Sequence, residues 1–518
     1  MVDKIGLRSR LGPWSAGVLV LLALLPSWRS PGAAGARASR TPPPLLTRAA
    51  QQPATSIRVI VQVQRPSGIA GVERVVVGLG GRVTTTLPLI HAFAATLAVR
   101  AVPALTRTPG VRWVSRDAPV VQSGLISAAG LLPPTCASCI DTSHLQNAYI
   151  RAIGADKLWN SASDLQGQGI GVAVVDSGIA PHADFDGTNG SSRIVASVTF
   201  NGLLTSLADG YGHGTHVAGI IGGNGSLSSG GYIGVAPKVN LINVRVSSDA
   251  GATSTSDVVT SLQWVLAHKT TYNIRVVNLS LTGGVADSYN VDPLDAACEI
   301  LWNNGIVVVV AAGNNGSTTN GVVYPPANDP FVLTVGAVDD KGTASTSDDT
   351  LAPYSAYGTT SDGFAKPDVV APGSHIISTL GSTSATMVVA HLDHLVLNPS
   401  YFRMSGTSMA APMVSGAVAL LLQAQPSLTP DQVKYRLEAT AHPLGTGTGA
   451  GELDAYAAVN SATTASANTG LAASKVLTTG SQPVTWNSAN WNSANWSSAN
   501  WSSANWSSAN WSSDYWGP

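Results

Sequence analysis

The sequence predicts an α/β domain built on a doubly wound, mostly parallel sheet, and two observations support this fold class. Short runs of apolar, β-branched residues are bounded by turn residues, which is typical of strands buried on both faces. Stretches with helical character alternate with these runs, as in a parallel α/β sheet. The predicted strands are Ile170–Val175, Asn240–Val246, Val276–Leu281, Ile306–Ala311 and Val332–Val338.

Helices are predicted between and after these strands. Thr255–His268 and Pro293–Asn303 are the two helices that we expect between strands. Another helix should begin with Thr429 as its N-cap and Pro430 in its first position, where a missing N–H costs no hydrogen bond. The apolar run from Met413 to Leu422 is too long for a strand, so we expect a buried helix there.

A smaller unit precedes this domain in the chain. Its predicted strands are Ser56–Val63, Arg82–Leu87, Ala92–Val99 and Val111–Ser115, and its predicted helices are 67–81 and Val102–Thr108. The resulting order, β-α-β-β-α-β, is that of a ferredoxin-like α+β unit. The sequence therefore predicts two folded units of different class.

The N-terminus has the features of an export signal. Basic residues precede an apolar core from Ala16 to Leu25, and Ala34-Gly35-Ala36 offers a cleavage site of small residues. This apolar segment is shorter than a typical membrane-spanning helix, although a retained N-terminal anchor is the alternative. We therefore predict a secreted or cell-surface protein.

These patterns divide the chain into seven segments. They are a signal peptide at 1–36, a linker at 37–55, the small unit at 56–118, a connector at 119–148, the α/β domain at 149–460, a second linker at 461–485 and a tail at 486–518. In the tail, tryptophan recurs every five residues from Trp486 to Trp516. A period of five residues fits neither a strand nor a helix. We therefore expect a flexible tail whose aromatic rings bind a cell surface or polysaccharide. A pentapeptide-repeat β-helix is the alternative.

Charge and cysteine content limit the classes of function. Only 11% of the residues are charged, which argues against nucleic acid as the main partner. Residues 1–118 carry 15 Lys+Arg and 3 Asp+Glu, a net charge of +12, whereas the remainder carries 13 and 26, a net charge of −13. Segments of opposite sign attract each other electrostatically. The cysteines are few for an exported chain; Cys136 and Cys139 could pair locally and leave Cys298 free.

A serine lies at the predicted start of the apolar helix, within Gly406-Thr407-Ser408-Met409-Ala410-Ala411-Pro412. Gly406 allows backbone to approach this serine closely. The N–H groups of a first helical turn have no helical partner and favour negative charge. Ser408 would therefore suit acyl transfer, in which an oxyanion forms beside such donors. A simple capping role is the alternative.

Two further residues supply the other groups that a nucleophilic serine needs. Asp176 follows a predicted strand, at the edge of the sheet where α/β proteins bind ligands. His213 lies in a glycine-rich turn that leads into a small-residue helix. A nucleophilic serine needs a base to remove its proton and a carboxylate to orient that base, and these residue types provide both.

Together these motifs resemble the subtilisin-like serine proteases (subtilases). The matching stretches are Val174–Gly178, His213–Gly219, Ala311–Asn314, Lys366–Gly373 and Gly406–Pro412. The resemblance implies a subtilisin-like fold over about 149–460, with Asp176 orienting His213 as general base and Ser408 as nucleophile. It implies that Asn314 donates a hydrogen bond to the oxyanion, and that His216 is structural.

The resemblance also implies partners and a substrate pocket. The small unit looks like the family's propeptide, which assists folding and inhibits in cis until it is cut. The predicted substrate-binding residues are Ser280, Leu281, Thr282, Ala312, Gly313 and Val323. Their small or apolar side chains predict a preference for small or medium apolar residues, and Ala118-Pro119-Val120-Val121 suits cleavage after Val120 or Val121.

No cofactor is expected for catalysis, and the sequence leaves metal binding undecided at two positions. The family often binds structural calcium, and Asp184 falls near a matching ligand position although the loop at 222–231 departs from the usual one. An enlarged segment, Leu380–Arg403, contains His391-Leu392-Asp393-His394, which suggests either a metal site or a solvated loop. We assign no metal ligand from the sequence.

The sequence thus predicts a monomeric, secreted serine endopeptidase that acts on protein or peptide substrates and is made as a self-processed precursor. A cell-surface binding or adhesive protein on a degenerate protease fold is the alternative. The presence of all four residues Asp176, His213, Asn314 and Ser408 disfavours that alternative.

Overall fold

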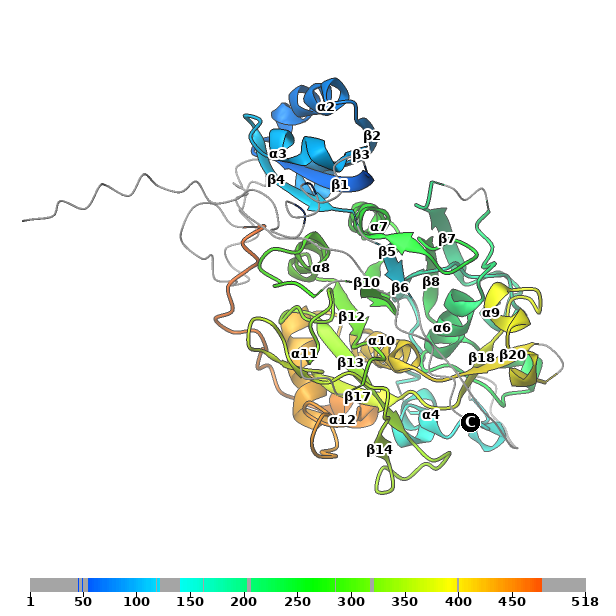
Figure 1. Ribbon diagram of the computed structural model, residues 1–518. Coiled ribbons are helices and arrows are strands. Elements are labelled where there is room, and N and C mark those ends of the chain that lie inside the picture. Colours follow the sequence, from blue (N-terminus) through cyan, green and yellow to red (C-terminus); the bar gives the residue numbers. More distant parts are fainter. Residues whose placement is uncertain are drawn as a thin grey trace, which may run out of the picture. The chain divides into compact units, whose positions relative to one another are not determined.

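A computed structural model describes residues 55–117, 119–121, 140–161, 163–202, 206–284, 286–316, 321–397 and 400–477, together with Leu45 and Ala49. The predicted signal peptide, both cysteines of the connector and the tryptophan tail lie outside these residues. Figure 1 shows the arrangement of the described elements.

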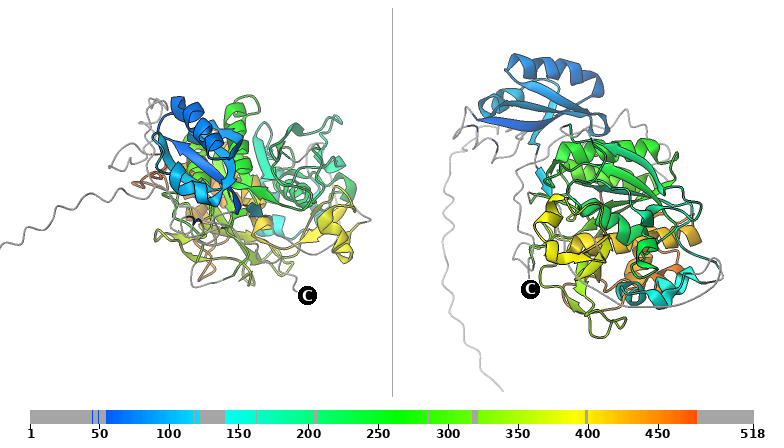
Figure 2. Two further views of the ribbon diagram at one scale, coloured as in Figure 1. Left: turned by 45° about the horizontal axis from the view of Figure 1, so that its top comes forward. Right: turned by 90° about the vertical axis from the view of Figure 1, so that its right-hand side faces the viewer.

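The small N-terminal unit has the predicted ferredoxin-like fold. Its elements are β1 (Ser56–Val63), α2 (Ile69–Gly78), β2 (Arg82–Leu87), β3 (Ala92–Ala98), α3 (Val102–Leu105) and β4 (Val111–Arg116). They form an antiparallel sheet of order β2-β3-β1-β4. Figure 2 shows α2 lying on one face of this sheet.

Both faces of the small sheet are covered. Successive strand residues point to opposite faces, and in β1 they join two different cores. Val61 packs with Val72 and Val76 of α2 in a separate N-terminal core. Ile60 and Trp113 instead belong to the core of the larger domain. This second contact removes the inside–outside alternation that a free sheet would show.

The larger domain contains the predicted mostly parallel sheet. Its strands are β6 (Gly171–Asp176), β7 (Ile194–Thr199), β8 (Asn240–Arg245), β10 (Ile274–Leu279), β12 (Val307–Ala311), β13 (Leu333–Asp339), β14 (Thr350–Leu351) and β17 (Val369–Pro372). The order is β14-β13-β12-β10-β6-β8-β7, with β17 also paired to β13, and only the β13–β14 pair is antiparallel. Five of these strands match the predicted runs within about two residues at either end.

Helices cover the sheet on two sides. They are α6 (His213–Gly222), α7 (Thr255–His268), α8 (Pro293–Asn303), α10 (Thr407–Ala424), α11 (Pro430–Thr440) and α12 (Ala455–Asn460). α7 and α8 pack together, while α10 packs on α6 and α12 (Figure 1). Side-chain caps fix the starts of α7, α8 and α11, because Ser254, Asp292 and Thr429 each accept a backbone N–H there.

Shorter elements lie around this frame. They are α4 (Tyr149–Ala152), α5 (Asp156–Trp159), α9 (Thr386–Val389), β5 (Pro119–Val121), β9 (Thr253–Ser254), β11 (Thr282–Gly283), β15 (Gly358–Thr359), β16 (Ala365–Lys366), β18 (Ile376–Thr379), β19 (Leu395–Val396) and β20 (Tyr401–Met404). The enlarged segment Leu380–Arg403 contributes α9, β19 and most of β20, and β20 joins β18 in a separate antiparallel sheet.

The packing corrects two predicted boundaries. Val476 and Leu477 belong to the main core, and the backbone of Ser474 donates to the buried carboxylate of Glu299. The α/β domain therefore continues beyond residue 460 into the segment that we predicted as a linker. In the predicted first linker, Leu45 and Ala49 are helical and pack in the N-terminal core.

α10 is long and apolar enough to cross a membrane by length and composition, and 89% of its apolar window is buried within the protein. It is the central helix of the domain and contacts five strands of the main sheet, β6, β10, β12, β13 and β17. Among the described residues, Cys298 on α8 is a buried free thiol.

Candidate functional site

Asp176 and His213 are in direct contact at the edge of the main sheet. Asp176 is the last residue of β6 and His213 is the first residue of α6. The Nδ1 atom of His213 lies 2.9 Å from Oδ1 and 3.0 Å from Oδ2 of Asp176, and both side chains are buried. This contact fixes the imidazole orientation and favours the tautomer with hydrogen on Nδ1.

Glycine at position 212 is required by the turn before His213. Its φ is +103°, which is a left-handed conformation that side chains disfavour. A Cβ atom there would also lie 3.1 Å from Cβ of Ala385. The turn can therefore bring His213 close to Asp176 only with glycine at this place.

Ser408 lies in the first turn of α10, as predicted. Pro412, one turn later, has no N–H to donate to the carbonyl of Ser408. The hydroxyl of Ser280 supplies that hydrogen bond at 2.9 Å, and the Ser408 hydroxyl donates to the carbonyl of Ser280 at 3.2 Å. These two bonds connect the start of α10 to the chain just after β10. Since α10 also packs on α6, Ser408 and His213 begin neighbouring helices.

The side-chain amide of Asn314 has a fixed orientation beside Ser408. Its Oδ1 atom accepts hydrogen bonds from the backbone N–H and the hydroxyl of Thr407, both at 2.9 Å. The Thr407 hydroxyl in turn accepts from the N–H of Gly313 at 3.1 Å. Because two donors face the amide oxygen, the NH2 group must point to the other side.

Five of the six predicted substrate-binding residues occupy two adjacent segments, 280–282 and 312–313. Ser280 and Leu281 are buried, and Thr282 begins β11. A Cβ atom on Gly313 would lie 3.7 Å from Cγ2 of Thr282, so the two segments lie side by side. Ala312 and Val323 are also buried.

The segment after the N-terminal unit pairs with this region. β5 is the middle strand of a three-stranded antiparallel sheet, between β9 and β11. Val121 pairs with Thr282 and Val120 with both Gly283 and Thr253. An extended peptide added between two strands is a common way of binding peptide substrates and inhibitors.

His216 occupies a structural position. Its Nε2 atom lies 2.9 Å from the carbonyl of Phe402 and 3.2 Å from that of Ile376. Burial, with a smaller effect from His213, lowers the pKa of His216 to about 3. A neutral ring donating to backbone carbonyls is not a candidate base.

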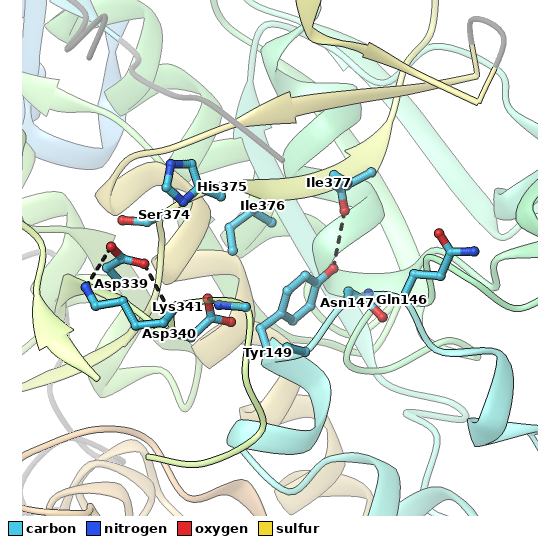
Figure 3. A pocket seen from close by; sticks show the side chains of 12 residues that line it. Gln146, Asn147, Tyr149, Asp339, Asp340, Lys341, Ser374, His375, Ile376 and Ile377 are labelled. Atoms are coloured by element: carbon cyan, nitrogen blue, oxygen red, sulfur yellow. Dashed lines mark hydrogen bonds and ion pairs between the residues drawn. The ribbon is translucent and has the colours of Figure 1, made fainter. Parts of the chain in front are cut away.

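A polar cavity that the sequence did not indicate lies elsewhere in the domain. It has a volume of about 460 Å³ and is lined by parts of three segments, 146–149, 339–342 and 374–377. Figure 3 shows Lys341 paired with Asp339, and the Tyr149 hydroxyl directed at the carbonyl of Ile377. None of the predicted site residues lines this cavity.

Comparison with known proteins agrees with the geometry. The model of the subtilase family matches residues 167–475. The chain belongs to the subtilase family. It is 40% identical to serine protease AprX of Bacillus subtilis over 303 residues, which are 57% of this chain and 66% of AprX. It is 35% identical to subtilisin DY of Bacillus licheniformis over 299 residues, 57% of this chain and 91% of that subtilisin.

A solved subtilase also shares the fold. The crystal structure of fervidolysin from Fervidobacterium pennivorans, described as a keratinolytic enzyme related to subtilisin, superposes with a TM-score of 0.61 at 26% identity. The match covers 79% of this chain and 61% of the fervidolysin chain. The subtilisin-like α/β fold predicted from the motifs is therefore confirmed.

Subtilases need no cofactor for catalysis and often bind structural calcium, for which Asp184 is the candidate ligand. Its Oδ1 accepts from the hydroxyl of Ser226 at 3.1 Å and the N–H of Leu227 at 3.0 Å. Its Oδ2 accepts from the hydroxyl of Tyr401 at 2.7 Å. Hydrogen-bond donors thus occupy both oxygens, where a calcium ligand would face the cation. Asp184 does not fit a calcium site in this arrangement.

The enlarged segment brings His391, Asp393 and His394 together, with one ligand atom of each within 4.8 Å of the others. The two imidazole rings are stacked with an angle of 13° between their planes. Ligand lone pairs lie in the ring planes, so nearly parallel rings do not converge on a single ion. A change of side-chain conformation would be needed before this cluster could bind a metal.

Proposed function

We propose that this subtilase is a secreted serine endopeptidase that hydrolyses peptide bonds through an acyl-enzyme on Ser408. The observation that carries the proposal is the Asp176–His213 contact at the start of α6, together with a serine in the first turn of α10, the helix that packs on α6. The Ser408 oxygen would attack the peptide carbonyl while His213 takes its proton and then delivers it to the leaving amine. Water would release the acyl group by the reverse sequence, with Asp176 stabilising the imidazolium.

We assign the oxyanion donors to Asn314 and the start of α10. Thr407 holds the oxygen of the Asn314 amide and leaves its NH2 group for the oxyanion. A preorganised donor of this kind acts on charge that develops only in the transition state. The role therefore concerns turnover rather than substrate affinity.

We propose that the N-terminal unit is an inhibitory propeptide acting in cis. Support comes from β5, which continues from this unit and lies between β9 and β11 beside the predicted substrate-binding residues. Val121 pairs with Thr282, whereas Ser408 bonds to Ser280, two residues earlier. In an antiparallel pair, the bond opposite Ser280 must therefore lie beyond Val121. This register moves the expected cleavage point from Val120 or Val121 toward the connector.

The contacts of this unit differ from simple charge attraction. Asp117 forms an ion pair with Arg58 at 2.6 Å, and it accepts from the N–H and hydroxyl of Ser256 in the first turn of α7. Leu89 donates its N–H to Gln263 of α7 at 2.8 Å. An acid of the basic unit thus binds a helix N-terminus, where a carboxylate is favoured.

The rest of the proposal follows from the family and the sequence. We infer protein or peptide substrates with small or medium apolar residues before the cleaved bond, because the proposed pocket residues are small or apolar. We propose an extracellular or cell-surface location, a monomer, and a tryptophan tail that adds surface binding. Calcium, if bound, would use a site other than Asp184.

A purified precursor tests this proposal. The wild-type chain should convert itself to a shorter form, hydrolyse peptides added in trans, and yield a new N-terminus beyond Val121. A peptide library should show cleavage after small or medium apolar residues. A folded chain that cleaves neither itself nor any peptide would contradict the proposal, and strong cleavage after Arg or Lys would contradict the proposed pocket.

A further inference from the structure

A second buried carboxylate lies behind the Asp176–His213 pair. Asp209 is 3% exposed and receives four hydrogen bonds. Its Oδ1 accepts from the N–H of Gly212 at 2.7 Å and from the hydroxyl of Ser177 at 2.8 Å. Its Oδ2 accepts from the N–H of Thr215 at 2.8 Å and from the hydroxyl of Thr215 at 2.7 Å. Such a set of donors suits an acceptor-only group such as an ionised carboxylate.

These bonds hold the backbone on both sides of His213. Asp209 binds the N–H of Gly212 before it and of Thr215 after it. The N–H of Gly214 donates to the hydroxyl of Ser177 at 2.9 Å. The N-cap of α6 is Gly212, which has no side chain to bind the first helical N–H groups. Asp209 supplies those acceptors from outside the helix, and its charge is favourable at that end.

The same network reaches Asp176. The Ser177 hydroxyl lies 3.2 Å from Oδ1 of Asp176 and 2.8 Å from Oδ1 of Asp209. The Ser177 N–H donates to Oδ1 of Asp176 at 2.7 Å. The hydroxyl of Thr215 also accepts from the N–H of Ala180, in the loop that follows β6. Asp209 therefore links the turn carrying His213 to the strand end carrying Asp176.

We propose that Asp209 is a positioning residue that keeps His213 aligned with Asp176. Asp209 itself touches neither substrate nor the reacting atoms; it acts through the backbone of Gly212 and Thr215. Burial raises the pKa of the Asp209 carboxyl, and its hydrogen bonds oppose this shift. The inference rests on the proposed role of His213 as general base.

Asp209→Asn in the full chain tests this role. Asparagine keeps the shape but directs an NH2 group at a donor, which breaks at least one of the bonds. We expect kcat to fall by about 100-fold, since a shift of about 1 Å near the reacting groups can have that effect. KM should stay within about threefold, because no substrate contact changes, and phosphonate labelling of Ser408 should slow in parallel with kcat.

Asp184→Asn is the matched control. Asp184 is equally buried and also accepts several hydrogen bonds, but it lies outside the proposed site. Both variants should lose thermal stability, and only Asp209→Asn should lose kcat. Equal stability losses with wild-type kcat in both would overturn the inference. If neither the wild type nor Asp184→Asn labels at Ser408, the proposed function itself fails.

A milder variant covers the case in which Asp209→Asn does not fold. Thr215→Val keeps the backbone N–H bond to Asp209 and removes only the hydroxyl bonds to Asp209 and Ala180. We expect kcat to fall about 3–10-fold with unchanged KM, less than in Asp209→Asn, because the N–H bonds from Gly212 and Thr215 to Asp209 remain. A Thr215→Val enzyme with wild-type kcat would contradict the positioning role.

Discussion

The two sheets of this protein are buried in different ways. The main sheet is covered on two sides by helices of its own domain, and β6, β10 and β12 are buried along nearly their whole length. The N-terminal sheet has helices of its own on one face only, and its other face contributes Ile60 and Trp113 to the core of the larger domain. The first sheet is therefore complete by itself, whereas the second needs its partner. This difference suits the proposed roles of the larger domain as a permanent scaffold and of the N-terminal unit as a removable inhibitor.

The largest expected effect is the loss of all cleavage, which would leave the N-terminal unit joined to the larger domain. Ser408→Ala should abolish peptide hydrolysis and leave the precursor uncut, because self-processing would use the same nucleophile. Ser415→Ala is a matched control on the same helix; its hydroxyl bonds to Asn278 rather than to a proposed catalytic group. Gel analysis and intact mass of both purified variants check the prediction. A normally processed Ser408→Ala chain would refute self-cleavage.

The next effect separates turnover from binding. Asn314→Ala should reduce kcat about 100–1,000-fold with little change in KM, the size known for removing this type of donor from a subtilisin. Asn315→Ala, the neighbouring amide, serves as the control and should stay near wild type. Steady-state kinetics on a peptide substrate decide the point. A change confined to KM would rule out the oxyanion role.

Neighbouring residues of β1 can sharpen the comparison of the two sheets. Ile60 faces the larger domain and Val61 faces α2. Ile60→Ala should weaken docking by roughly 2 kcal/mol, or about 30-fold, and shorten the lag between precursor cleavage and the appearance of activity. Val61→Ala should instead lower the yield of folded precursor. Equal effects of both variants on the lag would show that the two faces are not distinct.

How far the sequence predicts these features depends on the range of the interactions involved. α7 and α8 match their predicted bounds because local caps and a proline define their starts. The half-exposed β7 lacks a strong apolar run, so no pattern in the sequence predicts this strand. Residues 461–477 read as a linker because they are rich in Ala, Ser and Thr. They pack through long-range bonds such as that between Ser474 and Glu299.

The residues of the candidate site also divide into those that local motifs predict and one that only the folded structure reveals. Asp176, His213, Asn314 and Ser408 stand in motifs, so the sequence reveals them directly. Asp209 stands in an acidic, glycine-containing loop, where a carboxylate is ordinarily solvated. Its burial depends on Thr215 in the helix that follows and on Ser177, 32 residues earlier in the chain, and the contact with Ser177 cannot be inferred from a local pattern. The one sequence feature that points to Asp209 is its position four residues before His213.

The smallest effect concerns the pH dependence of docking. Burial, and to a lesser degree the charge of Asp117, raises the pKa of Asp257 to about 6, while Arg58 and Ser254 oppose the shift. A carboxyl whose pKa is raised by docking stabilises the docked state below its free pKa and loses that contribution as pH rises through about 6. Release of the cleaved unit, followed by gel filtration, should thus be slower at pH 5 than at pH 7.5. Asp257→Asn should flatten this dependence, and an unchanged slope would contradict the assignment.

The central claim is that Asp176, His213 and Ser408 act as one catalytic unit, and active-site labelling tests it most directly. The processed enzyme would be treated with a serine-directed phosphonate and mapped by peptide mass spectrometry. We predict a single label on Ser408, formed slowly or not at all in His213→Ala and in the uncut precursor. A label on another serine, or equally fast labelling of Ser408 without His213, would contradict this account.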